Sequence, residues 1–335
     1  MPVSRRSVLA WAAVGPVVRG RGAALDPHEL DAVFETAHGL ERLTSLAIHR
    51  RGRLVRQMFQ NGLPDDRALT NLKSISKGIL SILAGIALDR KDIGGVDEPV
   101  ATFLPAQLSQ ASGLRHLTIR HLLTLTADVV SDWAEVGASP DWIGHIVARG
   151  STGTLGQFRY STPATHLLSA ALTHATGTDL LSYARRHLFG PLGITEVVWD
   201  LDPQGYCRGG NDIHLGTRDL ARLGTLMLNE GIHERRRIVS ARWVRASTRK
   251  QVEITDAEAD PVGKLPLDGY GYLWWTMKVG PHDGYVGWGF GRQYLIVVPA
   301  TRSVVTLTCR YDAAGPKEHH LGVVSLLGAI ADLLA

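Results

Sequence analysis

The stretch Asn71-Leu72-Lys73-Ser74-Ile75-Ser76-Lys77-Gly78 and the apolar run that follows it as far as Gly94-Gly95 decide how the rest of the chain is interpreted. Apolar residues recur through this run at the spacing of one helix face, at Ile75, Ile79, Ile82, Leu83 and Ile86. The pattern predicts a helix with one buried side. It begins near residues 72–74, with Asn71 as its N-cap, and stops before the glycine pair.

Ser74 and Lys77 form an S-x-x-K motif at the start of this predicted helix. Residues three apart share a helix face, with Cβ atoms about 5–6 Å apart, so the lysine amine can reach the serine hydroxyl. Burial among apolar neighbours lowers a lysine pKa below its ordinary value of about 10.4 and leaves a neutral amine. The motif therefore pairs a nucleophile with its own base, and the free N–H groups of the first turn offer donors to an oxyanion.

Composition is typical of a globular protein with a substantial core: the 335 residues are 44% hydrophobic and 20% charged. The formal charge of +4 and the pI of about 9.1 are mild. No basic run alternates with aromatic residues, so the sequence does not favour nucleic-acid binding. We interpret Arg235-Arg236-Arg237 as a solvated turn between two elements.

The first residues resemble a twin-arginine export signal. Ser4-Arg5-Arg6-Ser7-Val8-Leu9 is followed by an apolar segment over residues 8–18 and small residues ending at Ala23-Ala24. The segment is shorter than the roughly 20 residues that span a bilayer, so we expect no stable membrane anchor. We predict that residues 1–24 engage the twin-arginine machinery transiently and that the protein is periplasmic or secreted in a bacterium. A ragged start or misplaced initiation codon is the alternative.

The cysteines and histidines do not indicate a metal site. Cys207 and Cys309 are the two cysteines, and their separation does not tell whether they form a disulfide. Fourteen histidines are scattered, among them His116, His121 and His319-His320, without the spacing or the Glu and Cys partners of a zinc site. We expect neither a metal nor an organic cofactor.

Strand patterns stand at both ends of the chain and helical patterns between them. Residues 43–49 and 53–59 are β-prone and flank Arg50-Arg51-Gly52, a tight-turn signal. Helical segments broken by Gly and Pro fill the middle third, at residues 115–124, 142–147 and 165–174. Further helices are predicted at 219–228, 241–248 and 323–334, and further strands at 270–279, 294–298 and 303–308.

This order predicts an α/β protein of the α+β kind. An antiparallel sheet built from both chain ends is flanked by helices, and a mostly helical lobe is inserted into it. Residues 25–335 then form a single catalytic domain, with an α/β lobe of residues 25–95 and 205–335 and a helical lobe of residues 96–204. The seam between the lobes is the natural place for a pocket.

Two later stretches supply what a nucleophilic serine needs. Tyr160-Ser161-Thr162 follows Gly156 and precedes a helix, which suits a loop that presents a tyrosine hydroxyl. Gly287-Trp288-Gly289-Phe290-Gly291 leads into a strand, and its glycines allow close approach to the backbone. A proton relay to the leaving group and an oxyanion site are the expected roles.

The order Ser-x-x-Lys, a Tyr-x-Asn-like loop and a glycine-rich strand entry resembles the serine hydrolases of the class C β-lactamase and penicillin-binding-protein superfamily. Residues 119–124, 188–194, 217–221 and 270–275 also resemble segments of that superfamily. The similarity runs from about residue 40 to the C-terminus. It is strongest toward the esterase and 6-aminohexanoate-dimer hydrolase type, whose glycine-rich strand resembles residues 289–293.

The resemblance implies an acyl-enzyme mechanism. Ser74 attacks a carbonyl, Lys77 takes its proton, Tyr160 relays a proton, and the backbone N–H groups of Ser74 and Phe290 hold the oxyanion. Substrate-binding positions map to Thr162, Gly287, Trp288 and Gly289. Two of these depart from the pattern: Thr162 replaces the commoner Asn, and Gly287 stands where penicillin-recognising enzymes carry Lys. Poor β-lactamase activity is therefore expected, because the cation that anchors a β-lactam carboxylate is missing.

The predicted function is hydrolysis of ester or amide bonds in small molecules through an acyl-enzyme on Ser74. One alternative is D,D-peptidase or β-lactamase activity on cell-wall peptides or β-lactams. Another is a catalytically silent binding protein that keeps the fold. An esterase of the nucleophile-elbow type is not supported, because the chain has no G-x-S-x-G.

Overall fold

The computed structural model describes residues 25–108, 114–129, 132–254, 266–311 and 317–335. The predicted export signal, residues 1–24, lies outside this part of the chain. None of the helices in the described ranges is long and apolar enough to cross a membrane.

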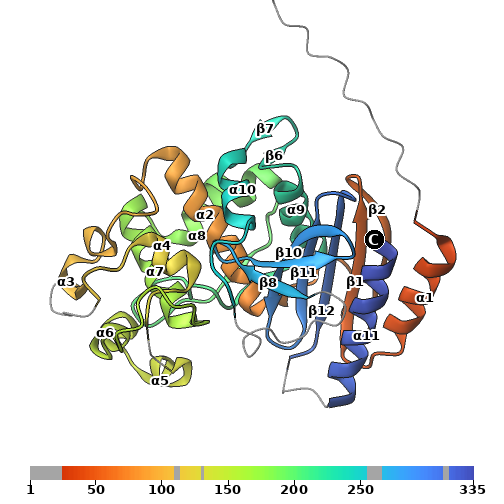
Figure 1. Cartoon of the computed structure of the whole chain (residues 1–335), viewed down its shortest axis with the longest axis horizontal. Coiled ribbons are helices and arrows are strands. Elements are labelled where there is room, and N and C mark those ends of the chain that lie inside the picture. The colour runs from red at the N-terminus through yellow and green to blue at the C-terminus, as the bar shows by residue number, and fades with distance from the viewer. Residues whose placement is uncertain (1–24, 109–113, 130–131, 255–265, 312–316) are drawn as a thin grey trace, which may run out of the picture.

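A seven-stranded antiparallel sheet joins the two ends of the chain, in the order β2-β1-β12-β11-β10-β9-β8 (Figure 1). In β1, Leu43 pairs with Cys309 of β12, so residues far apart in sequence form the centre of the sheet. This confirms the predicted antiparallel sheet. The strands are β1 (Leu43–Arg50), β2 (Arg53–Phe59), β8 (Leu267–Tyr270), β9 (Trp275–Val279), β10 (His282–Gly289), β11 (Gln293–Val298) and β12 (Ser303–Cys309).

Helices cover both faces of this sheet. On one face α1 (Pro27–His38) packs against the terminal helix α11 (Lys317–Leu334), and on the other α9 (Thr217–Leu228) packs against β11 and β12 (Figure 1). Helix α1 has no counterpart among the predicted elements. Asp26 caps it by accepting from the backbone N–H groups of His28 and Glu29, and Pro27 suits its first turn.

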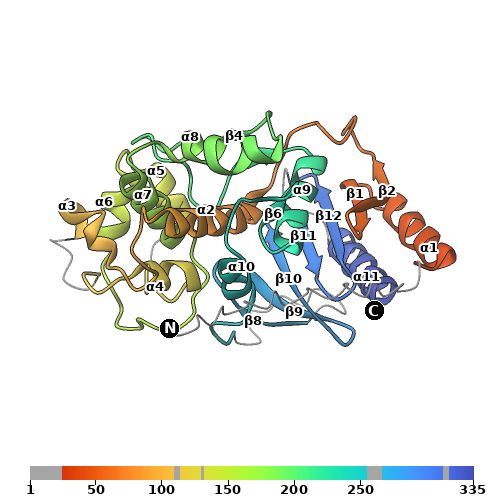
Figure 2. The same ribbon diagram turned by 90° about the horizontal axis from the view of Figure 1, so that it is seen from above.

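The segment between β3 (Thr70–Asn71) and β5 (Ile213–Leu215) is mostly helical, as expected for the middle of the chain (Figure 2). β3 and β5 pair in a small sheet of their own with β4 (Val198–Trp199). The helices are α2 (Ser76–Arg90), α3 (Pro105–Leu108), α4 (Ile119–Thr124), α5 (Trp133–Ala138), α6 (Trp142–Ala148), α7 (Thr162–Thr176) and α8 (Leu180–Ala184). After them, α10 (Ala241–Thr248) packs against α2.

The S-x-x-K helix differs from its prediction at its start and in its surroundings. A 3-10 turn over Lys73–Ile75 precedes α2, and Asn71 ends a strand instead of capping the helix. Every residue from Ser76 to Ala87 is buried, so the prediction of a single buried side was wrong. The reason is the position of α2 between the sheet and the helical segment, which cover opposite sides of it (Figure 2).

The apolar stretch 270–279, predicted as one strand, is divided. Strands β8 and β9 are separated at Leu273, whose φ of +65° takes the backbone out of the extended conformation. The Leu273 amide instead donates to the carbonyl of Leu123 in α4, which ties the helical segment to the sheet. Farther along, the glycine-containing β10 is a full strand that the sequence pattern did not predict. Cys207 and Cys309 are both buried and free, so they form no disulfide.

The packing of α2 makes a testable prediction at Gly85. A Cβ atom there would lie 2.2 Å from Trp243 Cδ1, and Trp243 is held by a 3.0 Å hydrogen bond from its Nε1 to the carbonyl of Ser81. Gly85→Ala should lower the free energy of unfolding by about 1–3 kcal/mol through overpacking. This exceeds the gain of about 1 kcal/mol that alanine brings to a helix interior. Urea denaturation measures the difference.

Gly137→Ala in α5 is the matched control, because no atom lies within 4 Å of the added Cβ. This variant should be neutral or slightly more stable than the wild type. Equal stability changes at the two positions would contradict the packing of Trp243 on Gly85.

Candidate active site

Ser74 lies at the junction between the small sheet and α2. It occupies the 3-10 turn Lys73–Ile75, directly after β3 and before the first residue of α2. Backbone N–H groups in the first turn of a helix have no intrahelical acceptor, so the Ser74 amide is available to an oxygen atom outside the helix. The nucleophile predicted from the sequence thus lies at the start of a buried helix.

The Lys77 amine is held by three oxygen atoms from three parts of the chain. Its Nζ lies 3.2 Å from Ser74 Oγ, 3.1 Å from Thr162 Oγ1 and 2.9 Å from the carbonyl oxygen of Gly210. The side chain is 1% exposed. Burial lowers the pKa of Lys77 to about 7, and the negative charge of Asp212 partly offsets this effect.

The contacts of Lys77 suit a neutral amine that takes a proton from Ser74. A neutral amine has two N–H donors and one lone pair. Gly210 O can only accept, and Thr162 Oγ1 can accept as well, so these two oxygens use both donors. The lone pair is left for the Ser74 hydroxyl proton. The structure thus brings Ser74 and Lys77 into contact, and their roles as nucleophile and base stay a prediction.

Tyr160 approaches the same pair from the loop before α7. Its hydroxyl lies close enough to Ser74 for the serine to lower the pKa of the phenol, and its ring centroid lies 4.8 Å from Lys77 Nζ. Desolvation raises the pKa of Tyr160 to about 12, against a smaller lowering by the hydrogen bond with Ser74. The phenol is therefore protonated at neutral pH. Its ring stacks on Trp275 of β9 at a centroid distance of 5.4 Å, which orients the hydroxyl.

Thr162 has a different contact from the one that the sequence suggested. It was predicted to bind substrate, but its hydroxyl lies against Lys77. Ser161, just before it, caps α7 by accepting from the Ala164 amide, and this fixes the turn that carries both Tyr160 and Thr162. Thr162 thus helps to aim the lysine lone pair, and direct contact with substrate stays a prediction.

Two glycines of β10 let this strand lie directly against the nucleophile segment. A Cβ at Gly289 would lie 2.4 Å from the carbonyl oxygen of Leu72, and one at Gly287 would lie 3.3 Å from Ile75 Cγ2. Phe290 follows at the end of β10 with a 61% exposed side chain. Its backbone amide directly follows the strand that lies against the Ser74 turn, and its role as a second oxyanion donor stays a prediction. The glycine positions, predicted as substrate contacts, have this packing role.

The tryptophans near the site mostly support its walls. Trp274 is 1% exposed and packs against Gly78 of α2, whereas the ring of Trp275 stacks on the ring of Tyr160. Trp288, predicted as a substrate contact, is half-buried, stacks on Tyr294 and lies at a centroid distance of 6.0 Å from Trp275. A hollow of about 410 Å³ adjoins Tyr160 and Thr162. It is also lined by Asp132, Trp133 and Arg159.

The segment Gly209-Gly210 contributes to the site and was not foreseen. A Cβ at Gly210 would lie 2.7 Å from Lys77 Cγ, and one at Gly209 would lie 2.1 Å from the carbonyl oxygen of Thr165, so only glycine allows this approach. The Gly209 amide donates to the buried His166, which pairs with Asp202 at 2.9 Å. The double glycine itself was the only signal in the sequence, and it indicates a turn without showing what the turn contacts.

The described parts of the chain contain no group of three or more His, Cys, Asp or Glu side chains that is placed to hold a metal ion.

Comparison with known proteins agrees with this arrangement. The family model described as Beta-lactamase matches residues 44–324. The 6-aminohexanoate-dimer hydrolase of Paenarthrobacter ureafaciens is 25% identical over 87% of this chain and 77% of its own length.

Among solved structures, EstCE1, a hydrolase with promiscuous acyltransferase activity, has a TM-score of 0.70 at 17% identity, covering 90% of this chain and 98% of its own. The D-amino acid amidase from Ochrobactrum anthropi SV3, complexed with L-phenylalanine amide, has a TM-score of 0.68 at 15% identity, covering 91% of this chain and 99% of its own. At these identities, the likeness of the solved structures establishes the fold.

The pKa of Lys77 predicts how the reactivity of Ser74 depends on pH. Ser74 can lose its proton only to the neutral amine, so its labelling by a fluorophosphonate should rise with pH and reach half of its plateau near pH 7. The rate of labelling between pH 5 and 9 measures this midpoint. A midpoint near pH 10, the value of an ordinary lysine, would contradict a buried neutral base. Ser74→Ala is the control and should not be labelled.

Proposed function

This chain belongs to the beta-lactamase family and is a serine hydrolase, and we propose that it cleaves ester or amide bonds of small molecules through an acyl-enzyme on Ser74. The observation that carries the proposal is the meeting of three groups at one oxygen atom. Ser74 Oγ is within reach of a lysine amine with a pKa of about 7, and the hydroxyl of a protonated tyrosine lies close to it.

Acylation follows from these contacts. Ser74 Oγ attacks the carbonyl carbon while its proton passes to Lys77 Nζ. The oxyanion of the tetrahedral intermediate lies between the backbone amides of Ser74 and Phe290. When the bond to the leaving group breaks, the leaving nitrogen or oxygen takes the proton of the Tyr160 hydroxyl, and the Lys77 ammonium replaces that proton. Lys77 is then neutral again, and the acyl group is bound to Ser74 as an ester.

Deacylation uses the same groups in reverse order. A water molecule attacks the ester carbonyl and gives its proton, through Tyr160, to Lys77. The bond to Ser74 Oγ breaks, the acid leaves, and the serine oxygen recovers its proton from Lys77. Lys77 and Tyr160 therefore return to their starting states, and the net reaction consumes one water molecule.

The comparisons support small esters and amides as the substrate class. The curated relative is named for hydrolysis of an amide dimer, and the structural relatives include an amidase and a hydrolase with acyltransferase activity. The site itself favours neither bond type, because Tyr160 can protonate an alkoxide or an amine leaving group equally well.

The site weighs against efficient turnover of β-lactams and of cell-wall peptides. A side chain at Gly287 would meet Ile75 and Trp274, and this position lacks the lysine that penicillin-recognising enzymes carry there. D,D-peptidase activity is the second candidate, favoured by the intact Ser74, Lys77 and Tyr160. The same intact contacts weigh against a catalytically silent binding protein.

A substrate panel tests the proposal. Wild-type protein should hydrolyse p-nitrophenyl esters of short acids and small amides, and Ser74→Ala should lose this activity by a factor of about 10³ or more. Nitrocefin and peptidoglycan stem peptides serve as the comparison substrates. Turnover of nitrocefin approaching that of the esters would contradict the substrate class, and equal activity in Ser74→Ala would contradict the acyl-enzyme.

We also propose export to the periplasm or beyond by the twin-arginine route, on the strength of Arg5-Arg6 and the short apolar segment after them. The full chain with Arg5→Lys and Arg6→Lys should remain in the cytoplasmic fraction of a bacterial host, whereas the wild-type chain should be processed and leave it. Equal distribution of the two chains on immunoblots of cell fractions would contradict this route.

A further inference from the structure

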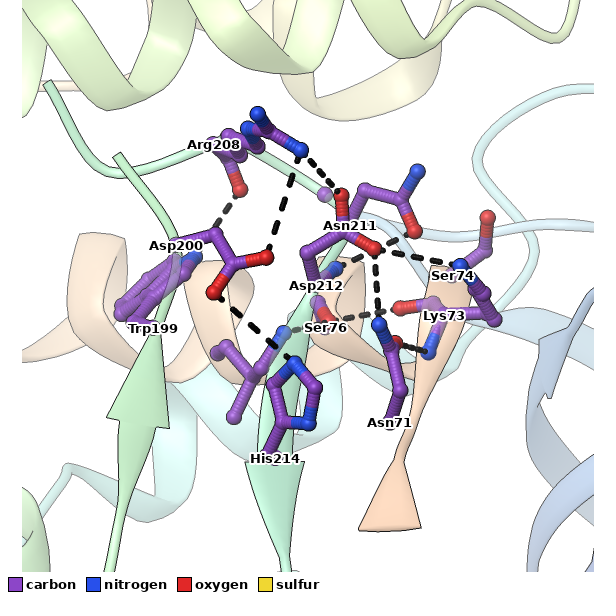
Figure 3. A network of polar contacts seen from close by, with 12 residues as sticks. Asn71, Lys73, Ser74, Ser76, Trp199, Asp200, Arg208, Asn211, Asp212 and His214 are labelled. Atoms are coloured by element: carbon purple, nitrogen blue, oxygen red, sulfur yellow. Dashed lines mark hydrogen bonds and ion pairs between the residues drawn. The ribbon is translucent and has the colours of Figure 1, made fainter. Parts of the chain in front are cut away.

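A buried carboxylate lies near the Ser74–Lys77 pair and contacts Lys73, the residue before Ser74. Asp212 directly precedes β5 and is 6% exposed. It is surrounded by Asn71, Lys73 and Arg208, and the network continues to Asp200 and His214 (Figure 3). The mechanism described above uses none of these side chains.

Three donors from separate parts of the chain converge on this carboxylate. Its Oδ1 accepts from Asn71 Nδ2 at 2.9 Å and from Lys73 Nζ at 3.3 Å, and its Oδ2 accepts from Arg208 at 3.1 Å. Burial alone would raise the pKa of Asp212, but these donors and the charge of Lys73 outweigh burial and lower it. Asp212 is therefore charged throughout the neutral range.

The donors on one side belong to the residues just before the nucleophile. Lys73 has a φ of +50°, an unfavourable conformation for a side chain of this size. Three contacts hold it there: its amide donates to Asn71 Oδ1 at 2.9 Å, its carbonyl accepts from Ser76 Oγ at 2.6 Å, and its ammonium binds Asp212. The conformation of Lys73, and with it the position of Ser74 in the 3-10 turn, thus depends on Asp212.

The other side of the carboxylate leads to the base. Gly210, whose carbonyl oxygen accepts from Lys77 Nζ, lies two residues before Asp212 in the same chain segment. Asp212 itself has a φ of +58°, which Asp tolerates better than most residues. The short segment 210–212 therefore contacts Lys77 through the Gly210 carbonyl. It also contacts Lys73, the residue before Ser74, through the Asp212 carboxylate.

We propose that Asp212 is a positioning residue that aligns Ser74 with Lys77, with Lys73 as its counterion. The inference rests on the proposed function, because it assigns a role in bringing that nucleophile and base together. It adds two charged residues that neither touch the reacting atoms nor belong to the S-x-x-K motif.

The charges around Ser74 and Lys77 make the positioning role of Asp212 measurable through the pKa of Lys77. Asp212 faces Lys77, and its negative charge raises the pKa of the amine against the lowering by burial. Lys73 and Arg208 face Asp212 from the other side, while Asp200 and His214 lie beyond Arg208. Tyr160 faces Lys77 as a neutral phenol, and the ring of Tyr311 lies 4.0 Å from Lys73 Nζ. Removing Asp212 or Lys73 therefore changes the field at Lys77 in opposite directions.

Two variants should shift the acid limb of the pH profile of kcat/KM in opposite directions. Asp212→Asn removes the negative charge and keeps a residue that tolerates a positive φ. It should move the limb to lower pH, on the order of one unit. Lys73→Met keeps an unbranched side chain on Tyr311 but removes one of the two cations that contact Asp212 and leaves Arg208, so it should move the limb to higher pH. Both should lower the plateau value of kcat/KM on a p-nitrophenyl ester, and the double variant should return the limb toward its wild-type position.

Asp200→Asn is the matched control, since Asp200 belongs to the same network but contacts neither Lys73 nor Lys77. Its acid limb should stay in place. The same limbs are measured by fluorophosphonate labelling, which needs only Ser74 and its base, on samples whose folding is checked by thermal unfolding. Asp212→Gly, which also fits the positive φ, serves if Asp212→Asn does not fold.

If the acid limbs of Asp212→Asn and Lys73→Met move in the same direction, or do not move, while Ser74 is still labelled, the proposal is wrong. Absence of labelling in the wild type would instead show that the proposed function is wrong.

Discussion

The amine of Lys77 lies inside the protein, where an ammonium ion loses its hydration and a neutral amine loses much less. The folded chain therefore holds a base with a pKa of about 7, whereas the unfolded chain carries one of about 10.4. Between these values the unfolded chain binds a proton that the folded chain does not bind. The stability of the fold consequently rises with pH across this window, and below pH 7 the cost of burying the amine is constant. The site is thus maintained at the expense of stability at neutral pH.

Several elements exclude water from the Lys77 amine and still supply its hydrogen-bond partners. Helix α2 is enclosed between the sheet and the helical segment, which removes water from all of its sides (Figure 2). Gly210 and Thr162 supply the acceptors that water would otherwise provide. Gly289 allows β10 to lie against the Ser74 turn. Desolvation of its hydroxyl raises the pKa of Tyr160 and keeps the phenol a proton donor.

The parts of this arrangement that were predictable depend on short sequence separations or on resemblance to known proteins. Ser74 and Lys77 are three residues apart, so helix geometry alone relates them. The antiparallel sheet followed from strand patterns at both chain ends. Tyr160 and Phe290 came from the order of motifs in related hydrolases; the structure brings Tyr160 close to Ser74, and the role of Phe290 stays a prediction. In each case the evidence was contained in a few adjacent residues or in a known order of such groups.

What could not be predicted depends on contacts between distant segments. The start of α2 shifted because Asn71 pairs in a strand with β5, more than a hundred residues later. The run 270–279 was divided because the Leu273 amide has its acceptor in α4. Asp212 and Gly210 look like an ordinary turn until their partners Lys73 and Lys77 are known. A periodic pattern describes which side of an element is apolar, but it does not show which neighbour covers that side.

The assembly of the site from α2, the Tyr160 loop, the Gly210 segment and β10 has a consequence for the chain before it is folded. Without these neighbours Ser74 is an ordinary alcohol, and Lys77 is fully protonated in water at neutral pH. A newly made or locally opened chain is thus chemically inert toward the esters and amides around it. Reactivity of Ser74 needs all four segments together, so folding itself converts this serine from an ordinary alcohol into a nucleophile.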